Sequence, residues 1–141
     1  EYEENLLKKI INTSKSEIKF KKIIQKIYDK RIVYRASTSY INQLIESGIE
    51  VYLYNGFIHS KVIVMDDSVT SVGTANFNMR SFSLNFEINA FITDLEITRQ
   101  VKEIFYEDIN HSIKLDENFE KNKPLLVKLE ESICRLFVLL F

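Results

Sequence analysis

Two side chains suited to phosphate chemistry lie two residues apart near the middle of the chain. His59 and Lys61 stand at the head of an apolar run, and Asp66 follows that run directly. If residues 61–65 form a strand, alternate side chains share one face, so His59 and Lys61 project together with their Cα atoms about 7 Å apart. A histidine nitrogen can attack phosphorus, and a lysine ammonium can hold a phosphate oxygen. The spacing therefore indicates phosphodiester chemistry.

A Gly-Thr-x-Asn turn follows this first motif. It contains Gly73, Thr74 and Asn76, and the acid Glu87 opens the next strand-like run. The glycine is expected to let the backbone approach the phosphate closely. Because both motifs and the acid occur in one short stretch, coincidence is a poor explanation for them.

Asp66 has a different local setting from the other polar residues. It ends the apolar run and is followed by Asp67 and Ser68, a composition typical of turns. We therefore interpret Asp66 as a turn residue rather than as an acid that touches the substrate. It still completes the pattern His-x-Lys-x4-Asp and stays among the candidate catalytic residues.

These two motifs resemble the signature of the phospholipase D superfamily. The likeness is carried by His59-Ser-Lys61-x4-Asp66 and by Gly73-Thr-Ala-Asn76-Phe-Asn-Met-Arg80-Ser. Residues 54–61, residues 80–92 and the tail from Lys123 to Phe141 further resemble the C-terminal catalytic half of bacterial cardiolipin synthases. The similarity runs from about Ile32 to the last residue and is weaker over residues 1–31.

The resemblance implies a role for each of these residues. His59 is the nucleophile, and Glu87 is the acid that orients its ring and stabilises the charge that develops on it. Cationic and hydrogen-bonding groups hold the phosphate oxygens, where negative charge grows in the transition state. No cofactor or metal is expected. The expected catalytic residues are His59, Lys61, Asp66 and Glu87, and the expected phosphate-binding residues are Lys61, Thr74 and Asn76.

The implied function is that of a phosphatidyltransferase of the cardiolipin synthase type. The enzyme takes a phosphatidyl group from phosphatidylglycerol onto a histidine and passes it to a second phosphatidylglycerol. The expected partners are this phospholipid and the membrane surface, and the expected location is cytoplasmic and membrane-associated in a bacterium. Two alternatives remain open: a homodimeric phospholipase D-like phosphodiesterase that hydrolyses its substrate, and a catalytically silent truncated fragment.

One departure from the family pattern is that the motif occurs once. The family has a second copy, whose histidine protonates the leaving alkoxide. The chain has two histidines, and His111 lacks a lysine two residues on, so we interpret His111 as an exposed residue at a helix end. The chain is thus expected to supply half of an active site, completed by a second phospholipase D-type half domain from a homodimer or from a longer chain.

A second departure lies upstream. Residues 6–18 resemble the helix and strand entry that open the family's second half, and residues 22–33 resemble a stretch well beyond that entry. A crossover between parallel strands needs about a dozen residues or more, and Glu17 to Lys22 is too short to supply one. We therefore expect an α/β fold: a phospholipase D-type half domain with a mixed β-sheet flanked by helices, lacking one βα unit near the N-terminus.

Composition places the chain in one domain, residues 1–141. It has 141 residues, of which 45% are hydrophobic, and this suits one core. The net charge of −1 gives no general attraction to nucleic acid, so none is expected as a partner. The first third is nonetheless basic, which fits either a solvated helical face or a surface for lipid headgroups. No signal peptide, no transmembrane-length apolar run and no disulfide are expected, since Cys134 is alone.

Hydrophobic periodicity and turn residues predict the elements. A helix is expected over 39–47, ended by Gly48, and strands over 49–54, 61–65, 69–72 and 87–93. Thr93 and Glu96 suggest a capping box for a helix that buries Ile97, Val101, Ile104 and Phe105. An amphipathic helix over 124–141 starts with Pro124, and we expect its apolar stripe to pack on the sheet; the alternative is that it lies in the headgroup layer. The stripe comprises Leu125, Leu129, Ile133, Leu136, Phe137 and Leu140.

Overall fold

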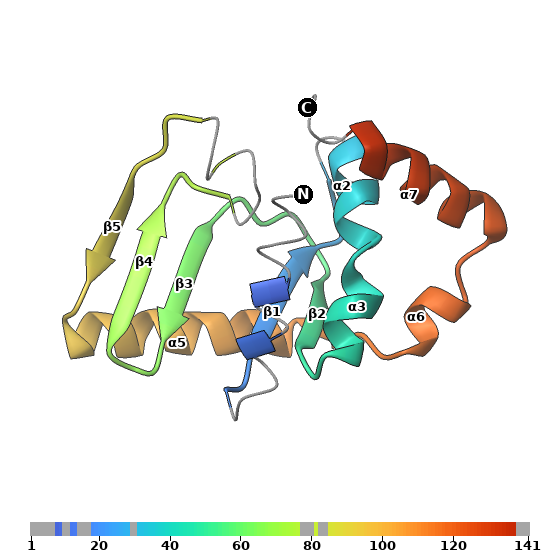
Figure 1. Cartoon of the computed structure of the whole chain (residues 1–141). Helices are drawn as coiled ribbons and strands as arrows, with labels where there is room; N and C mark the ends of the chain where they lie inside the picture. The colour runs from blue at the N-terminus through green and yellow to red at the C-terminus, as the bar shows by residue number, and fades with distance from the viewer. Residues whose placement is uncertain are drawn as a thin grey trace.

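The protein folds as two small β-sheets flanked by helices (Figure 1). The computed structural model describes residues 8–9, 12–13, 18–28, 31–76, 81 and 85–137. The strands are β1 (Lys21–Gln25), β2 (Glu50–Tyr54), β3 (Lys61–Met65), β4 (Val69–Gly73), β5 (Asn89–Ile92) and β6 (Ser112–Lys114). The helices are α2 (Arg31–Thr38), α3 (Ile41–Glu46), α5 (Leu95–Asn110), α6 (Asn118–Lys121) and α7 (Leu125–Phe137). The α/β class predicted from the sequence is confirmed.

The expected mixed sheet is divided into two sheets of three strands. The first sheet has the order β1-β2-β6, with β1 and β2 parallel and β6 antiparallel to β2. The second has the order β3-β4-β5 and is antiparallel throughout. Helix α5 contacts β2 and β6 of the first sheet and β3 and β4 of the second, and Figure 1 shows it running past both. In the described part of the chain, β1 and β3 each end their own sheet.

The hydrophobic core belongs to the first sheet. Ile41 and Leu44 of α3 pack with Ile49, Val51 and Leu115, and all five are buried. Alternation along β2 sends Val51 and Leu53 to the side of the sheet that α3 covers, and Ile24 lies opposite Leu53 in the parallel register. Gly48 has a φ of 84° and ends the helical segment in the left-handed conformation, as the sequence predicted.

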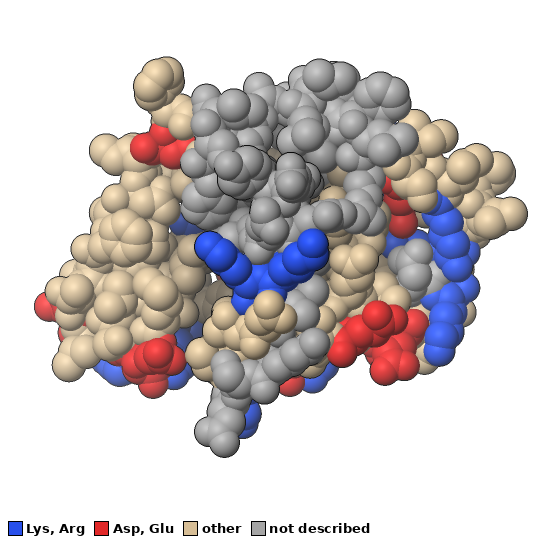
Figure 2. Space-filling model, viewed as in Figure 1, with Lys and Arg blue, Asp and Glu red and all other residues tan. Residues whose placement is uncertain are grey.

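The second sheet is thinner and more exposed. Its buried residues include two polar ones, Thr70 and Ser71 of β4, while Ile63 of β3 and Phe91 of β5 are exposed. Ser71 lies between Ile63 and Phe91 in the ladder. The space-filling view shows few charged side chains over these strands, at the left of Figure 2. This sheet nevertheless carries the motif residues.

Helix α5 corrects two expectations. Its N-cap is Asp94 rather than Thr93, and the Asp94 carboxylate accepts a hydrogen bond from Ile97 N at 2.9 Å. The predicted partner in the capping box, Glu96, forms an ion pair with Arg99 instead. Ile97 and Ile104 were expected to be buried but are exposed, and the buried residue of the helix is Thr98. The reason is that α5 crosses strands of two sheets, so the side of the helix that is buried is the side that contacts these strands and not the side that carries the apolar stripe.

The last helix also corrects an expectation. Leu125, Leu129 and Ile133 were expected to pack on the sheet, but all three are exposed. Helix α7 packs instead on α2, through the opposite face that carries the buried residues Glu131 and Cys134. Residues 138–141, including Leu140, lie outside the described residues, as do the side chains of Leu136 and Phe137.

Candidate active site

The segment that leads to His59 is held by the first sheet and runs into the second. His59 lies between β2 and β3, two residues before β3 begins. Gln25, the last residue of β1, accepts a hydrogen bond from Ile58 N through its side-chain oxygen at 3.1 Å. Ile27 N donates to Gly56 O at 3.0 Å. The candidate nucleophile therefore stands at the junction of the two sheets.

His59 and Lys61 lie next to one another, as their spacing predicted. The His59 ring is exposed and stacks on Phe57, with ring centroids 5.9 Å apart and planes 7° from parallel. The Lys61 ammonium donates to the backbone oxygen of His59 at 2.6 Å. This hydrogen bond is exposed to solvent. An oxygen of a phosphate bound at His59 could therefore replace the backbone oxygen as the acceptor from the Lys61 ammonium.

Glu87 is held by polar groups on the same edge. Hydrogen bonds from Thr74, then from Asn85 and Ser81, lower the pKa of the Glu87 carboxyl, and the positive charge of Lys61 adds to the effect. Asn85 donates to the carboxylate at 3.1 Å. Glu87 is thus favoured in its ionised form, which is the form required to support a positively charged imidazole.

Thr74 positions this acid rather than offering a free donor. Its hydroxyl accepts from Ile88 N at 3.0 Å, and Thr74 N donates to Ile88 O at 3.0 Å. The same hydroxyl is a hydrogen-bond partner of Glu87. The sequence assigned Thr74 to the phosphate, whereas in the structure its hydroxyl bonds the backbone between Glu87 and the start of β5.

Asn89 is a positioning residue that sequence reasoning missed. Its side-chain nitrogen donates to Ser71 Oγ at 3.0 Å, and its side-chain oxygen accepts from Ala75 N at 3.2 Å. It thereby ties the turn after β4 to the first residue of β5. The available signal was a polar residue inside the predicted strand 87–93, but its hydrogen-bond partners follow from the pairing of Asn89 with Gly73.

Gly73 is required for a reason that differs from the expected one. A Cβ atom at this position would collide with the Asn89 side chain and with the Ile88 carbonyl. The glycine therefore allows β5 to approach β4 closely. Asn76 follows three residues later and is exposed at the end of a described segment. Residues 77–80, including Arg80 of the second motif, lie outside the described residues.

Asp66 is separated from the other candidates. Asp66 and Asp67 have φ angles of 47° and 58°, and Ser68 N donates to Met65 O at 3.0 Å. Two successive positive φ values are typical of a type I′ hairpin turn, a conformation that aspartate tolerates better than most residues. The five residues of β3 place this turn about 16 Å from Lys61. The structure thus confirms the turn interpretation and does not bring Asp66 to His59.

His111 lies just before β6, the edge strand of the first sheet opposite to β1. It caps the C-terminus of α5, is exposed, and its Nδ1 is 2.8 Å from Glu107 O. The next residue pairs with Tyr54 in β6, the strand separated from β1 by β2. The interpretation of His111 as an exposed helix-end residue is confirmed.

The described residues contain no group of three or more His, Cys, Asp and Glu residues that could hold a metal ion. A pocket of about 440 Å³ opens between α2, α6 and α7. Its lining includes Tyr34, Arg35 and Lys123 and none of the candidate residues above. The candidate chemistry is therefore on an open edge of the molecule and not inside that pocket.

Comparisons with known proteins identify the family of this chain. The family described as cardiolipin synthase, PLD-like domain, matches residues 2–109. The major cardiolipin synthase of Bacillus subtilis is 48% identical over 109 residues, which is 77% of this chain and 23% of that protein. The cardiolipin synthase of Geobacillus thermodenitrificans is 41% identical over 135 residues, which is 95% of this chain and 27% of that protein. The chain thus spans about a quarter of the length of these relatives.

The fold has a counterpart among solved structures. Nuc from Salmonella typhimurium, a phospholipase D family member, matches with a TM-score of 0.65 at 23% identity, over 77% of this chain and 72% of that one. The likeness supports the shared fold alone. Since the family match extends over residues 2–109 and the curated relatives exceed 40% identity, this chain belongs to the PLD-like domain family of cardiolipin synthases, within the phospholipase D superfamily.

Proposed function

We propose that this chain supplies one half of the active site of a phosphatidyltransferase of the cardiolipin synthase type. The supporting observation is the arrangement at one edge of the second sheet. His59 is exposed beside the Lys61 ammonium, and Glu87 is held by hydrogen bonds within the field of the same ammonium. A nucleophile, a cation and an ionised acid therefore face one region, which is the set that transfer through a histidine requires.

The first step moves the phosphatidyl group to the protein. A neutral His59 nitrogen attacks the phosphorus of phosphatidylglycerol, the N–P bond forms, and the bond from phosphorus to the glycerol oxygen breaks. Lys61 and Asn76 stabilise the non-bridging oxygens, whose negative charge increases in the transition state. Glu87 favours the positive charge that the imidazole gains when its nitrogen bonds to phosphorus.

The second step returns the histidine to its starting state. The hydroxyl of a second phosphatidylglycerol attacks the same phosphorus, its proton passes to the group that protonated the glycerol alkoxide in the first step, the N–P bond breaks, and cardiolipin is released. Glycerol leaves the first step as an alkoxide and needs a proton. We assign that acid to a second half domain, provided by another copy of this chain or by a longer one, because His111 lies across the first sheet with its ring held at Glu107 O.

The phospholipid substrate makes a membrane surface the second expected partner. No helix in the described part of the chain is long and apolar enough to cross a bilayer. The proposal therefore needs a surface contact through which the chain reaches its lipid.

The test is to trap the intermediate. The purified chain is incubated with phosphatidylglycerol labelled in the phosphatidyl group, and base-stable, acid-labile label on the protein is measured. We expect label on the unaltered chain and on His111→Ala, and none on His59→Ala. This pair is matched, because each variant removes one of the two histidines.

Complementation and product analysis sharpen this test. A cardiolipin synthase of full length, inactivated at the histidine of its own second motif, is mixed with the chain to offer the other half. Label that appears alone or in the mixture supports the proposal, and lipid products then separate transfer to cardiolipin from hydrolysis to phosphatidic acid. Absence of label in both conditions, on a chain shown by circular dichroism to be folded, would favour a silent fragment and overturn the proposal.

A further inference from the structure

Helix α7 turns its apolar side away from the protein. Leu125, Leu126, Leu129 and Ile133 have exposed fractions of 81%, 80%, 58% and 48%. At 100° per residue these four side chains fall within about 100° of the helix circumference, so they form one continuous stripe. Figure 1 shows α7 on the outer side of α2, at the edge of the molecule farthest from the second sheet. We call these four residues the α7 stripe.

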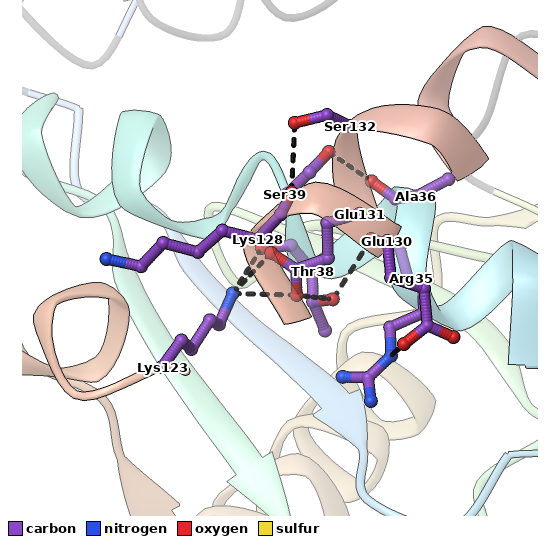
Figure 3. Close-up of polar contacts among 9 residues, drawn as sticks. All are labelled: Arg35, Ala36, Thr38, Ser39, Lys123, Lys128, Glu130, Glu131 and Ser132. Atoms are coloured by element: carbon purple, nitrogen blue, oxygen red, sulfur yellow. Dashed lines mark hydrogen bonds and ion pairs between the residues drawn. The ribbon is translucent and has the colours of Figure 1, made fainter. Parts of the chain in front are cut away.

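The opposite face of α7 is fixed by polar contacts (Figure 3). Glu131 has an exposed fraction of 2% and lies between Lys123 and Thr38. Its carboxylate accepts from Lys123 Nζ at 2.9 Å and from Thr38 Oγ1 at 2.7 Å. A rotation that brought the stripe inward would bury it against α2 only by leaving this carboxylate without its partners, which costs several kcal/mol in a desolvated setting.

A second set of ion pairs supports the same orientation. Glu130 pairs with Arg31 at 2.7 Å and with Arg35 at 3.3 Å, both on α2. Glu130 and Glu131 therefore hold the polar face of α7 to partners that span two turns of α2. The stripe stays outside because of these contacts, and its exposure is a property of the packed helix.

A lipid surface is the partner that suits this stripe. Four adjacent large apolar side chains without an acidic residue among them are the pattern of a helix that lies in the interface of a bilayer. At 13 residues α7 is about 20 Å long, which fits a helix lying along the surface. Lys121 precedes the stripe in sequence and Lys128 lies between Leu126 and Leu129, and Figure 2 shows Lys and Arg side chains in blue at the right-hand edge beside the tan surface. These charges favour an anionic lipid.

The stripe is also connected to the candidate active site. Arg31, which pairs with Glu130 of α7, is the first residue of α2. Helix α2 follows β1 in the chain, and Gln25 at the end of β1 holds Ile58, next to His59. In Figure 1 the start of α2, the last turn of α7 and the start of β3 all lie at the upper side of the molecule.

We propose that the α7 stripe inserts into the headgroup layer of an anionic phospholipid bilayer, so that α7 lies along the membrane and holds the chain at the surface that contains its lipid substrate. This inference rests on the proposed function, since it names the surface through which the lipid substrate is reached. It commits to lipid as the occupant. A second protein chain on the stripe is the competing outcome.

A tryptophan scan tests the insertion, because the chain has no tryptophan of its own. Leu129→Trp places the reporter on the stripe, and Ile104→Trp places it on α5 at the same exposed fraction of 58%. With vesicles of phosphatidylglycerol and phosphatidylcholine, we expect a blue shift and quenching by acyl-brominated lipid for Leu129→Trp. For Ile104→Trp we expect no change.

Polar substitutions test the energetic role of the stripe. Leu126→Gln with Leu129→Gln removes two of its side chains, and Ile97→Gln with Ile104→Gln is the matched pair on α5. We expect the first pair to weaken partitioning into these vesicles about tenfold or more, since each leucine that enters the interface contributes of the order of a kcal/mol. The second pair is expected to change it less than about twofold.

Three outcomes would overturn the inference. One is equal emission shifts at positions 129 and 104. Another is a shift at position 129 that grows with protein concentration in the absence of vesicles, which would assign the stripe to a protein contact. The third is unchanged partitioning of the Leu126→Gln, Leu129→Gln variant.

Further measurements separate this inference from the proposed function. His59→Ala should bind vesicles as the unaltered chain does, since the stripe is intact. Label from dispersed short-chain phosphatidylglycerol should still reach His59 in the Leu126→Gln, Leu129→Gln variant. Vesicle binding without any label would thus sustain the stripe and refute the chemistry, and label without binding would do the reverse.

Discussion

The two sheets differ in how they are stabilised and in which residues they carry. The sheet β1-β2-β6 packs with α3 around five buried apolar residues and is fastened at its open face by the ion pairs of Glu50. The sheet β3-β4-β5 carries the motif residues, yet its buried residues include Thr70 and Ser71, and it exposes Ile63 and Phe91. One sheet holds the apolar core, and the other holds polar groups in place by hydrogen bonds.

This difference shows how a site can be built on a weakly packed element. Side chains such as Lys61 and Glu87 must stay accessible to a substrate, so they cannot also contribute to a core. Their positions are fixed instead by hydrogen bonds that the Thr74 and Asn89 side chains accept from nearby backbone N–H groups, and by the anchoring of residues 56–58 to the first sheet. Stability supplied by one sheet therefore supports geometry in the other.

The largest expected effect comes from removing core volume in one sheet only. Ile41→Ala should lower the free energy of unfolding by about 2–4 kcal/mol, because Ile41 is buried in the apolar cluster. Ile63→Ala, on the exposed face of β3, should lower it by less than about 1 kcal/mol. Urea unfolding followed by circular dichroism measures both. Equal losses would mean that the second sheet has a core of its own.

The second prediction concerns positioning within the second sheet. Asn89→Ala should slow formation of the phosphohistidine by about 10- to 100-fold, because the turn after β4 loses its tie to β5 and the phosphate-binding groups shift. Asn42→Ala removes a similar amide, bonded to Glu46 in the first half of the molecule, and should leave the rate unchanged. The rate of label incorporation is the measurement. A normal rate in Asn89→Ala would remove this residue from the site.

Two buried threonines, one in β4 and one at the end of α2, test how a hydrogen-bond partner affects the free energy of unfolding. Thr70 Oγ1 is buried with no hydrogen-bond partner among the described residues, so Thr70→Val should raise the free energy of unfolding by about 1 kcal/mol. Thr38 is also buried, but its hydroxyl donates to Glu131, so Thr38→Val should lower it by about 1–2 kcal/mol. Thermal and urea unfolding give both values. The same sign for the two variants would contradict the comparison.

The smallest effect is a dependence on pH in the first sheet. Hydrogen bonds from Lys114, then Lys21 and Tyr52, lower the pKa of Glu50 to about 2 from an ordinary value of 4.5. A lowered folded-state pKa contributes stability above pH 4.5 that is lost as pH falls through about 2. Because the Glu50 side chain is about one-third exposed, solvent screens the effect and it should stay below about 1 kcal/mol.

Glu50→Gln provides the control for this dependence. Its free energy of unfolding should lie below that of the unaltered chain near neutral pH, and the difference should shrink as the solution is acidified from about pH 5 towards pH 2. Unfolding curves collected across that range measure the difference. A difference that stays constant over the range would show that the carboxylate charge of Glu50 is not the cause.

The sequence was a good guide wherever a local pattern decides the outcome. Alternation and turn residues predicted β2, β3 and β4 nearly to their ends, and the spacing of His59 and Lys61 predicted their proximity. Gly48 ended its helix as expected, because a positive φ is a local requirement. Two Asp residues after β3 indicated a turn, and the structure has one there.

Tertiary partners were beyond the reach of the sequence. Periodicity identified the apolar stripe of α7 but could not show that Glu131 would be the buried side, since that depends on Lys123 and Thr38 lying across the seam. The roles of Gly73 and Asn89 follow from the β4–β5 register, which pairs them. The Thr74 hydroxyl was assigned to a phosphate because its actual partner, Ile88 N, is 14 residues away in the sequence. A local pattern does not reveal such a contact.

Because the strands form two separate sheets, the length of α5 determines how far apart these sheets lie. This helix contacts β3 and β4 of the second sheet and β2 and β6 of the first, so its residue count sets the separation and rotation between the two sheets, whose junction carries His59. Inserting one residue would turn one sheet by about 100° relative to the other and displace it by about 1.5 Å. Family members that share this edge should therefore tolerate changes in the sequence of α5 much better than changes in its length.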